Sequence, residues 1–134
     1  MPELPEVETV RRGLADLLPG QAVVRATVFD SPKSFPNSPT DVQQFLYGAH
    51  VTAVRRRAKV LMIDLDSRYS LVIHLKMTGQ LIFRGANSFA GGHPNDSLIG
   101  ELPDKSTRVQ IDFTDGSHLF FNDQRKFGWM KLMP

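Results

Sequence analysis

Residues 107–122, TRVQIDFTDGSHLFFN, contain two strand-like runs rich in Val, Ile, Phe and Thr on either side of Asp115-Gly116. An Asp-Gly pair accepts the positive φ of a tight hairpin turn, so this stretch predicts a β-hairpin. Similar runs occur in QAVVRATVF (21–29), HVTAVRRR (50–57), VLMIDL (60–65), YSLVIHL (69–75) and QLIFR (80–84). No alternation of strands with helices is visible, which favours an antiparallel sandwich or barrel. We expect a mainly β fold, an antiparallel β-sandwich.

Two helices are expected to flank this sandwich. The first is predicted between Pro5 and Leu18, where apolar residues recur at helical spacing before Pro19-Gly20 end the segment. A second, short helix is predicted for residues 40–47, because Thr40 and Gln43 have capping-box spacing. The Pro-rich segment 31–39 and the long Gly- and Pro-containing segment 85–106 are expected to be loops.

The composition indicates one globular domain over residues 1–134, with 41% hydrophobic and 22% charged residues. There is no cysteine, so a disulfide or a thiolate zinc site cannot form within this chain. No apolar run has the roughly 20 residues of a membrane span, and we expect a cytoplasmic protein without a membrane partner. Only four of the 16 Lys and Arg residues, but six of the 14 Asp and Glu residues, precede residue 51. The later part is therefore the better candidate for contact with a polyanion.

The first six residues, Met1-Pro2-Glu3-Leu4-Pro5-Glu6, carry candidate chemistry. Removal of Met1 would expose the secondary amine of Pro2, and a free α-amino group is partly unprotonated near neutral pH. Such an amine can attack an electrophilic sugar carbon and form an iminium ion. Glu3 and Glu6 place carboxylates nearby for proton transfer. The alternative is that these acidic residues only complement the dipole of the following helix.

Four separated motifs together resemble the formamidopyrimidine-DNA glycosylase and endonuclease VIII family. They are PELPEVETVRRGL (2–14), RRRAKVLMIDL (55–65), HLKMTGQL (74–81) and FNDQRKFGWM (121–130). The resemblance implies a bifunctional DNA glycosylase and abasic-site lyase that acts on oxidised bases in double-stranded DNA. It is specific because the motifs occur in order along almost the whole chain.

The resemblance also implies roles for individual residues near the chemistry. Pro2 is similar to the family's Schiff-base nucleophile at C1′, Glu3 to its acid and Glu6 to a residue that orders the site. Lys59 and His74 resemble contacts to the DNA backbone beside the lesion. From the residues alone, Lys59 could instead be a solvated residue at a strand edge, and His74 a core histidine whose ring nitrogens have hydrogen-bond partners within the protein.

Extrusion of a damaged nucleotide leaves a gap in the duplex that the enzyme must stabilise. By resemblance, Met77 fills the vacated stack, Arg125 hydrogen-bonds the orphaned partner base and Phe127 wedges beside it. A flexible apolar chain, a planar guanidinium and a ring suit these tasks. Arg108 is a further candidate for DNA binding, with an exposed basic face as the alternative.

Family members continue with a helical domain containing a helix-two-turn-helix element and, in most, a four-cysteine zinc finger. Neither is found in these 134 residues, so we expect no cofactor here and place any zinc in that second domain. We expect a monomer with weak or undetectable activity on its own, and a preference for oxidised purines. Two alternatives stay open: a catalytically silent module that binds damaged DNA, and a structural β-sandwich without a DNA role.

Overall fold

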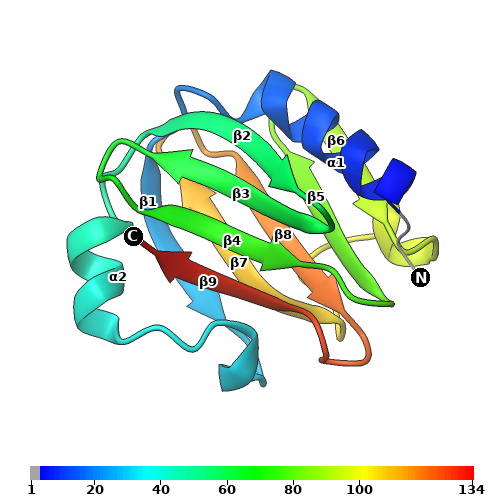
Figure 1. The fold of residues 1–134 in the computed structure, drawn as a ribbon. Coiled ribbons are helices and arrows are strands. Elements are labelled where there is room, and N and C mark those ends of the chain that lie inside the picture. Colours follow the sequence, from blue (N-terminus) through cyan, green and yellow to red (C-terminus); the bar gives the residue numbers. More distant parts are fainter. Residues whose placement is uncertain (1–3) are drawn as a thin grey trace.

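The computed structural model describes residues 4–134, which form two antiparallel sheets and two α-helices (Figure 1). The elements in chain order are α1 (Leu4–Leu17), β1 (Val23–Val28), the 3-10 helix η1 (Pro32–Ser34), α2 (Pro39–Phe45), β2 (Val51–Arg57), β3 (Val60–Leu65), β4 (Ser70–His74), β5 (Gly79–Arg84), β6 (Ser88–Gly92), the 3-10 helix η2 (Asp96–Leu98), β7 (Thr107–Phe113), β8 (His118–Asp123) and β9 (Trp129–Met133). One sheet has the order β1-β7-β8-β5-β6 and the other the order β2-β3-β4-β9. The predicted antiparallel β-sandwich with two helices is confirmed.

The hairpin of β7 and β8 lies in the middle of the five-stranded sheet. Gly116 has a φ of 88°, and its N–H donates to the carbonyl of Phe113 at 3.1 Å. Asp112 pairs with His118 directly before and after the turn. The predicted hairpin is confirmed, but only Gly116 and not Asp115 has a positive φ, so the turn is not of the primed type that the Asp-Gly pair suggests. Gly116 suits its position because glycine adopts a left-handed conformation without a steric penalty.

The inner faces of the two sheets form one core, in which Leu61, Ile63, Ile73, Ile111 and Phe121 are almost completely buried. Burial of side chains of this size stabilises the fold by about 1.5–3 kcal/mol each. The alternation of buried and partly buried residues along β3 and β4 follows from the pleat of a strand, which turns successive side chains to opposite faces.

The two sheets have β6 and β2 as edge strands on one side of the sandwich and β1 and β9 on the other, and a helical segment contacts an edge strand on each side. Helix α1 packs on the edge strands β2 and β6 and buries Val7, Val10 and Leu14 (Figure 1). Its approach to β6 is close, because a Cβ atom at Gly13 would lie 2.3 Å from the ring of Phe89. At the other opening, the side chain of Asn37 exchanges two 2.7 Å hydrogen bonds with the backbone of Leu132, on the edge strand β9.

Three local expectations differ from the structure. The segment 85–106 is not a plain loop, since it contains β6 and η2. Residues 129–133 form the additional edge strand β9, which pairs with β4. Helix α2 begins at Pro39 and is capped by Ser38, whose hydroxyl accepts a hydrogen bond from the backbone N–H of Asp41 at 3.2 Å. The expected cap at Thr40 is wrong because Ser38-Pro39 provides an acceptor followed by a proline suited to the first helical position.

Candidate nucleic-acid interface

Several of the sequence-predicted site residues lie at one end of the sandwich. The turn between β2 and β3 carries Lys59, β4 ends at His74, and the loops 75–78 and 124–128 follow β4 and β8. Figure 1 shows that the first turn of α1, in dark blue, lies at this same end of the molecule. Pro2 and Glu3 lie outside the described residues, whereas Glu6 is exposed in that first turn.

His74 lies between β3 and β9, opposite Val60 in one ladder and Trp129 in the other. Burial lowers the pKa of His74 below its usual 6.5, and the charges of Lys76 and Lys59 lower it further. Its Nδ1 atom lies 3.0 Å from the backbone N–H of Lys76. A backbone N–H can only donate, so Nδ1 accepts and the neutral ring carries its proton on Nε2. His74 is thus a half-buried imidazole with Nε2–H as its remaining donor.

Lys59 is half-exposed in the tight turn after β2, beside Ala58, which has a φ of 51°. Lys59 directly precedes Val60, which pairs with His74 across the β3–β4 ladder, and its positive charge contributes to the lowered pKa of His74. The β2–β3 hairpin and the end of β4 therefore bring a cation and a neutral hydrogen-bond donor to one place. Such a pair suits an anionic ligand such as a phosphate group.

Met77, Arg125 and Phe127 form a group that we call the loop cluster. Met77 comes from the loop 75–78, and the other two residues come from the loop 124–128. Nη1 of Arg125 lies 3.6 Å from the sulfur of Met77, and its Cζ lies 5.6 Å from the ring centroid of Phe127. Met77 is 43% exposed and Phe127 62% exposed. The structure therefore brings together two exposed apolar side chains around one guanidinium.

Arg108 occupies a different environment from the exposed basic face considered above. It is 5% exposed on β7, and its Nε donates to the backbone carbonyl of Asp123 at 2.8 Å. It also lines a polar hollow of about 630 Å³ beside the loop 124–128. The other residues of this hollow are Ser97, Asp104, Lys105, Ser106 and Gln124. Arg108 thus supports the start of the loop that carries part of the loop cluster.

Asp123 and Thr78 were not singled out from the sequence. Asp123 is completely buried at the end of β8, and its carboxylate accepts hydrogen bonds from the Thr78 hydroxyl and from the backbone N–H groups of Arg125 and Gly128. The only available signal was an acidic residue at the junction of a strand and a Gly-containing loop, a place where aspartate often binds nearby backbone N–H groups.

The basic run Arg55-Arg56-Arg57 is partly neutralised within the protein. Arg55 makes a bidentate ion pair with Asp64, at 2.5 and 3.0 Å, which lowers the pKa of that carboxyl. Nε of Arg56 lies 2.9 Å from Glu8 of α1. Hydrogen bonds from Arg11, then from Arg56 and Arg12, hold the pKa of Glu8 far below its usual range. The Arg56–Glu8 pair joins α1 to β2, and the Arg55–Asp64 pair joins β2 to β3. Together they leave less charge for a ligand than the sequence suggests.

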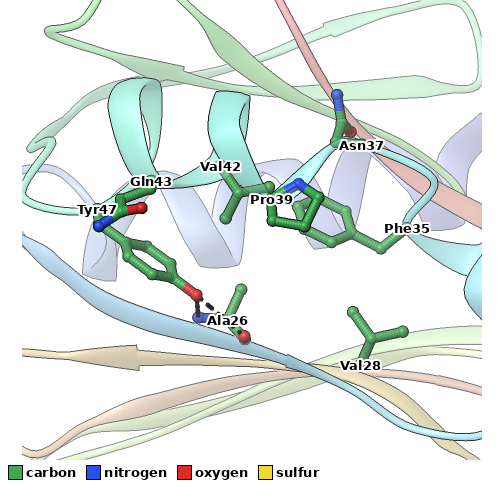
Figure 2. A pocket seen from close by; sticks show the side chains of 8 residues that line it. All are labelled: Ala26, Val28, Phe35, Asn37, Pro39, Val42, Gln43 and Tyr47. Carbon is green, nitrogen blue, oxygen red and sulfur yellow. Dashed lines mark hydrogen bonds between the residues drawn. The ribbon is translucent and has the colours of Figure 1, made fainter.

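An apolar pocket of about 410 Å³ lies near α2, at the end of the molecule opposite the loop cluster. Figure 2 shows its lining, which consists of Ala26, Val28, Phe35, Asn37, Pro39, Val42, Gln43 and Tyr47. Its main polar groups already have partners, because the Tyr47 hydroxyl contacts the backbone N–H and carbonyl of Ala26, both at 3.3 Å. The pocket therefore lacks the convergent polar groups of a catalytic site.

Within residues 4–134, no cluster of three or more His, Asp or Glu side chains could hold a metal ion. The four thiolates of the family's zinc finger also have no counterpart in this cysteine-free chain. No helix in the same range is long and apolar enough to cross a membrane.

Comparison with known proteins gives consistent matches over the whole chain. The family model of the formamidopyrimidine-DNA glycosylase N-terminal domain matches residues 1–130. The formamidopyrimidine-DNA glycosylase of Jannaschia sp. (strain CCS1) is 44% identical, over 99% of this chain and 45% of that protein. The one from Paracoccus denitrificans (strain Pd 1222) is 41% identical, over 100% of this chain and 46% of that protein. The chain therefore spans about half the length of these relatives.

Solved structures show the same similarity. Lactococcus lactis Fpg in complex with an abasic-site-containing DNA superposes with a TM-score of 0.78 and 27% sequence identity, over 98% of this chain and 43% of that one. A complex of the Lactococcus lactis protein with a FAPY-dG-containing DNA also gives a TM-score of 0.78, over 98% and 44% of the two chains. Both structures contain the Lactococcus lactis protein bound to DNA, with an abasic site in one and FAPY-dG in the other.

Proposed function

Because the chain belongs to the formamidopyrimidine-DNA glycosylase family through its N-terminal domain, we propose that it is the catalytic half of a base-excision repair enzyme. This enzyme removes oxidised purines from duplex DNA and then cleaves the DNA at the abasic site. The solved relatives that are bound to damaged DNA support DNA as the ligand. Bacterial relatives favour the cytoplasm as the compartment and chromosomal DNA as the substrate.

The single observation that carries this proposal is the loop cluster. Two loops separated by more than 40 residues of sequence bring Met77, Arg125 and Phe127 into contact at the surface. Large exposed apolar side chains grouped around a guanidinium suit insertion into a base stack, where apolar wedges separate bases and planar donors bind an unpaired base edge. Lys59 and the Nε2–H group of His74, at the same end of the sandwich, suit the adjoining phosphates.

The proposed chemistry begins after removal of Met1. The lone pair of the Pro2 nitrogen attacks C1′ of the extruded nucleotide, and the glycosidic electron pair leaves with the base. The amine nitrogen then loses its proton and donates its lone pair to C1′ as the C1′–O4′ bond breaks, and O4′ takes up a proton; this opens the sugar ring and gives an iminium ion. The iminium ion makes the C2′ proton acidic, and removal of that proton expels the 3′ phosphate. Glu3 supplies or receives protons at the sugar, and Glu6 orders the site. The positive end of α1 favours the neutral, nucleophilic form of the amine.

In this proposal these 134 residues have weak activity when tested by themselves, because the relatives that they match are about twice as long. The chain acts as a monomer. Its contacts to phosphate reside in few side chains, so its affinity for DNA falls with salt along a shallow slope.

Reductive trapping tests the proposed chemistry. We expect borohydride to link the Met1-free chain covalently to an abasic-site oligonucleotide, with removal of Met1 verified by mass spectrometry. Pro2→Gly diminishes the adduct, and retention of Met1 abolishes it, since an amide nitrogen has no available lone pair. Pro39→Ala, a matched proline substitution at the start of α2, leaves the yield unchanged.

The possible outcomes separate the candidate functions. An adduct that depends on Pro2 supports the glycosylase and lyase chemistry. Lesion-dependent binding without any adduct, unchanged by Pro2 substitution, identifies a silent module that recognises damaged DNA. If the chain does not bind DNA even at low salt, the remaining alternative is a structural β-sandwich without a DNA role.

A further inference from the structure

Asp123 connects the two loops that carry the loop cluster. One carboxylate oxygen accepts the hydroxyl of Thr78, the residue after Met77, and the backbone N–H of Arg125 at 3.2 Å. The other accepts the backbone N–H of Gly128, the residue after Phe127, at 2.5 Å. Each member of the loop cluster is therefore bonded to this carboxylate directly or through its immediate neighbour.

The backbone of Asp123 is held as firmly as its side chain. Its N–H donates to Ser106 at 2.8 Å, and its carbonyl accepts from Nε of Arg108 at 2.8 Å. The side chain is 0% exposed. A buried carboxylate is costly unless hydrogen bonds compensate its lost hydration, so an acid at this position requires all of these donors. The hydrogen bonds around Asp123 thus anchor both loops to the end of β8.

Both loops also contain a strained residue immediately before the exposed apolar side chain. Lys76 precedes Met77 with a φ of 55°, and Lys126 precedes Phe127 with a φ of 61°. A left-handed conformation costs a residue other than glycine about 1 kcal/mol or more. Such conformations persist only where surrounding contacts hold them. The backbone N–H of Lys76 donates to Nδ1 of His74 at 3.0 Å and that of Lys126 to the carbonyl of Asp123 at 3.3 Å, and the Asp123 carboxylate adds hydrogen bonds to both loops.

We propose that Asp123 is a positioning residue, which preorganises Met77, Arg125 and Phe127 for insertion into the gap left by the extruded nucleotide. This inference rests on the proposed function. The residue contributes to recognition of the duplex lesion and has no part in the chemistry at C1′. Asn at position 123 keeps the shape but replaces one acceptor with an NH₂ donor. In one orientation the NH₂ faces the Thr78 hydroxyl and the backbone N–H of Arg125, and in the other it faces the backbone N–H of Gly128, so either orientation loses at least one hydrogen bond to the loops.

Abasic DNA in two forms tests this role. A single strand has no stacked gap to fill, whereas a duplex does, so trapping on the single strand reports chemistry and trapping on the duplex also reports insertion. We expect Asp123→Asn to lower the rate of borohydride trapping on the duplex at least fivefold and to leave the single-strand rate within twofold. Asp112→Asn is the matched control, a buried carboxylate on β7 near the opposite end of the same sheet.

Thr78 supplies a second, milder pair of variants in case Asp123→Asn does not fold. Thr78→Val removes the hydroxyl with little change of shape and should lower the duplex rate selectively. Thr78→Ser retains the hydroxyl and should restore it. Equal losses on both DNA forms, or no loss on the duplex, would overturn the inference.

Failure of the proposed chemistry gives a different result. In that case the unsubstituted chain forms no adduct on either DNA form. The ratio of its affinities for duplexes with and without a tetrahydrofuran abasic analogue then replaces the trapping rates. A ratio that Asp123→Asn and Thr78→Val leave unchanged refutes the positioning role, and a ratio that both lower supports it.

Discussion

The effect of Gly13→Ala on the free energy of unfolding is expected to depend on the residue at position 89, destabilising the protein when Phe89 is present and stabilising it when the ring is removed. Gly13 lies inside α1, where glycine costs about 1 kcal/mol relative to alanine. The new methyl group, however, would lie 2.3 Å from two ring atoms of Phe89 and 2.7 Å from a third. Ordinary carbon contacts begin near 3.5 Å, so the ring or the helix must move by about 1 Å.

These two effects oppose each other, and their magnitudes decide the outcome. Overpacking of this kind costs about 1–3 kcal/mol. Gly13→Ala should therefore lower the free energy of unfolding by about 0–2 kcal/mol in the unsubstituted chain. In a Phe89→Ala background the ring is absent, and the same substitution should raise the free energy of unfolding by about 1 kcal/mol.

Urea denaturation of the four proteins in this double-mutant cycle measures the coupling between positions 13 and 89. We expect a coupling of about 1–3 kcal/mol, with equal m-values. Additive effects within about 0.5 kcal/mol would refute the idea that this glycine permits the close approach of α1 to β6.

Three further predictions concern the turn, an ion pair and the loop cluster. Gly116→Ala should lower the free energy of unfolding by about 1 kcal/mol, since φ is 88° while nothing lies within 4 Å of the added Cβ; an unchanged urea midpoint would contradict this. Arg55 depresses the pKa of Asp64, so its stabilisation is present above the ordinary value of 3.8 and is lost as pH falls through the lower folded-state pKa. Asp64→Asn should therefore reduce the loss of unfolding free energy that the unsubstituted chain shows as the pH falls. Parallel curves of unfolding free energy against pH for the two proteins would contradict a stabilising role of the Arg55–Asp64 pair. Phe127→Ala should keep stability within about 0.5 kcal/mol, because the ring is exposed, yet reduce the preference for abasic over intact duplex in a fluorescence-anisotropy titration. An unaltered preference for abasic over intact duplex would show that Phe127 does not contribute to lesion recognition.

Elements with strong local signals could be predicted from the sequence. The β7–β8 hairpin follows from Asp115-Gly116 and its flanking strands, and α1 follows from apolar residues at helical spacing. Strand β6, SFAGG, has no such pattern. It exists through long-range contacts, namely its pairing with β5 and the close packing of Gly91 under Val10 of α1. Those contacts are invisible to a local pattern.

The candidate site divides in the same way. Family resemblance directed attention to Met77, Arg125 and Phe127, and the structure shows that Met77 and Phe127 both lie against the guanidinium of Arg125. Asp123 could not be predicted, because its importance depends on Thr78, which lies 45 residues away in sequence. The buried hydrogen bond from Arg108 to the backbone carbonyl of Asp123 could not be predicted either, since the local sequence indicates only a charged residue in a strand.

The internal ion pairs of Arg55 and Arg56 have a consequence for the way this chain meets DNA. Charges neutralised by Asp64 and Glu8 create little field beyond the surface, so long-range attraction contributes modestly to the rate of encounter. In the proposed function, random collision then brings the chain to intact and damaged sites at similar rates. Under that proposal, discrimination between the two arises from how long each complex lasts, with the residence time set by the short-range fit of the loop cluster.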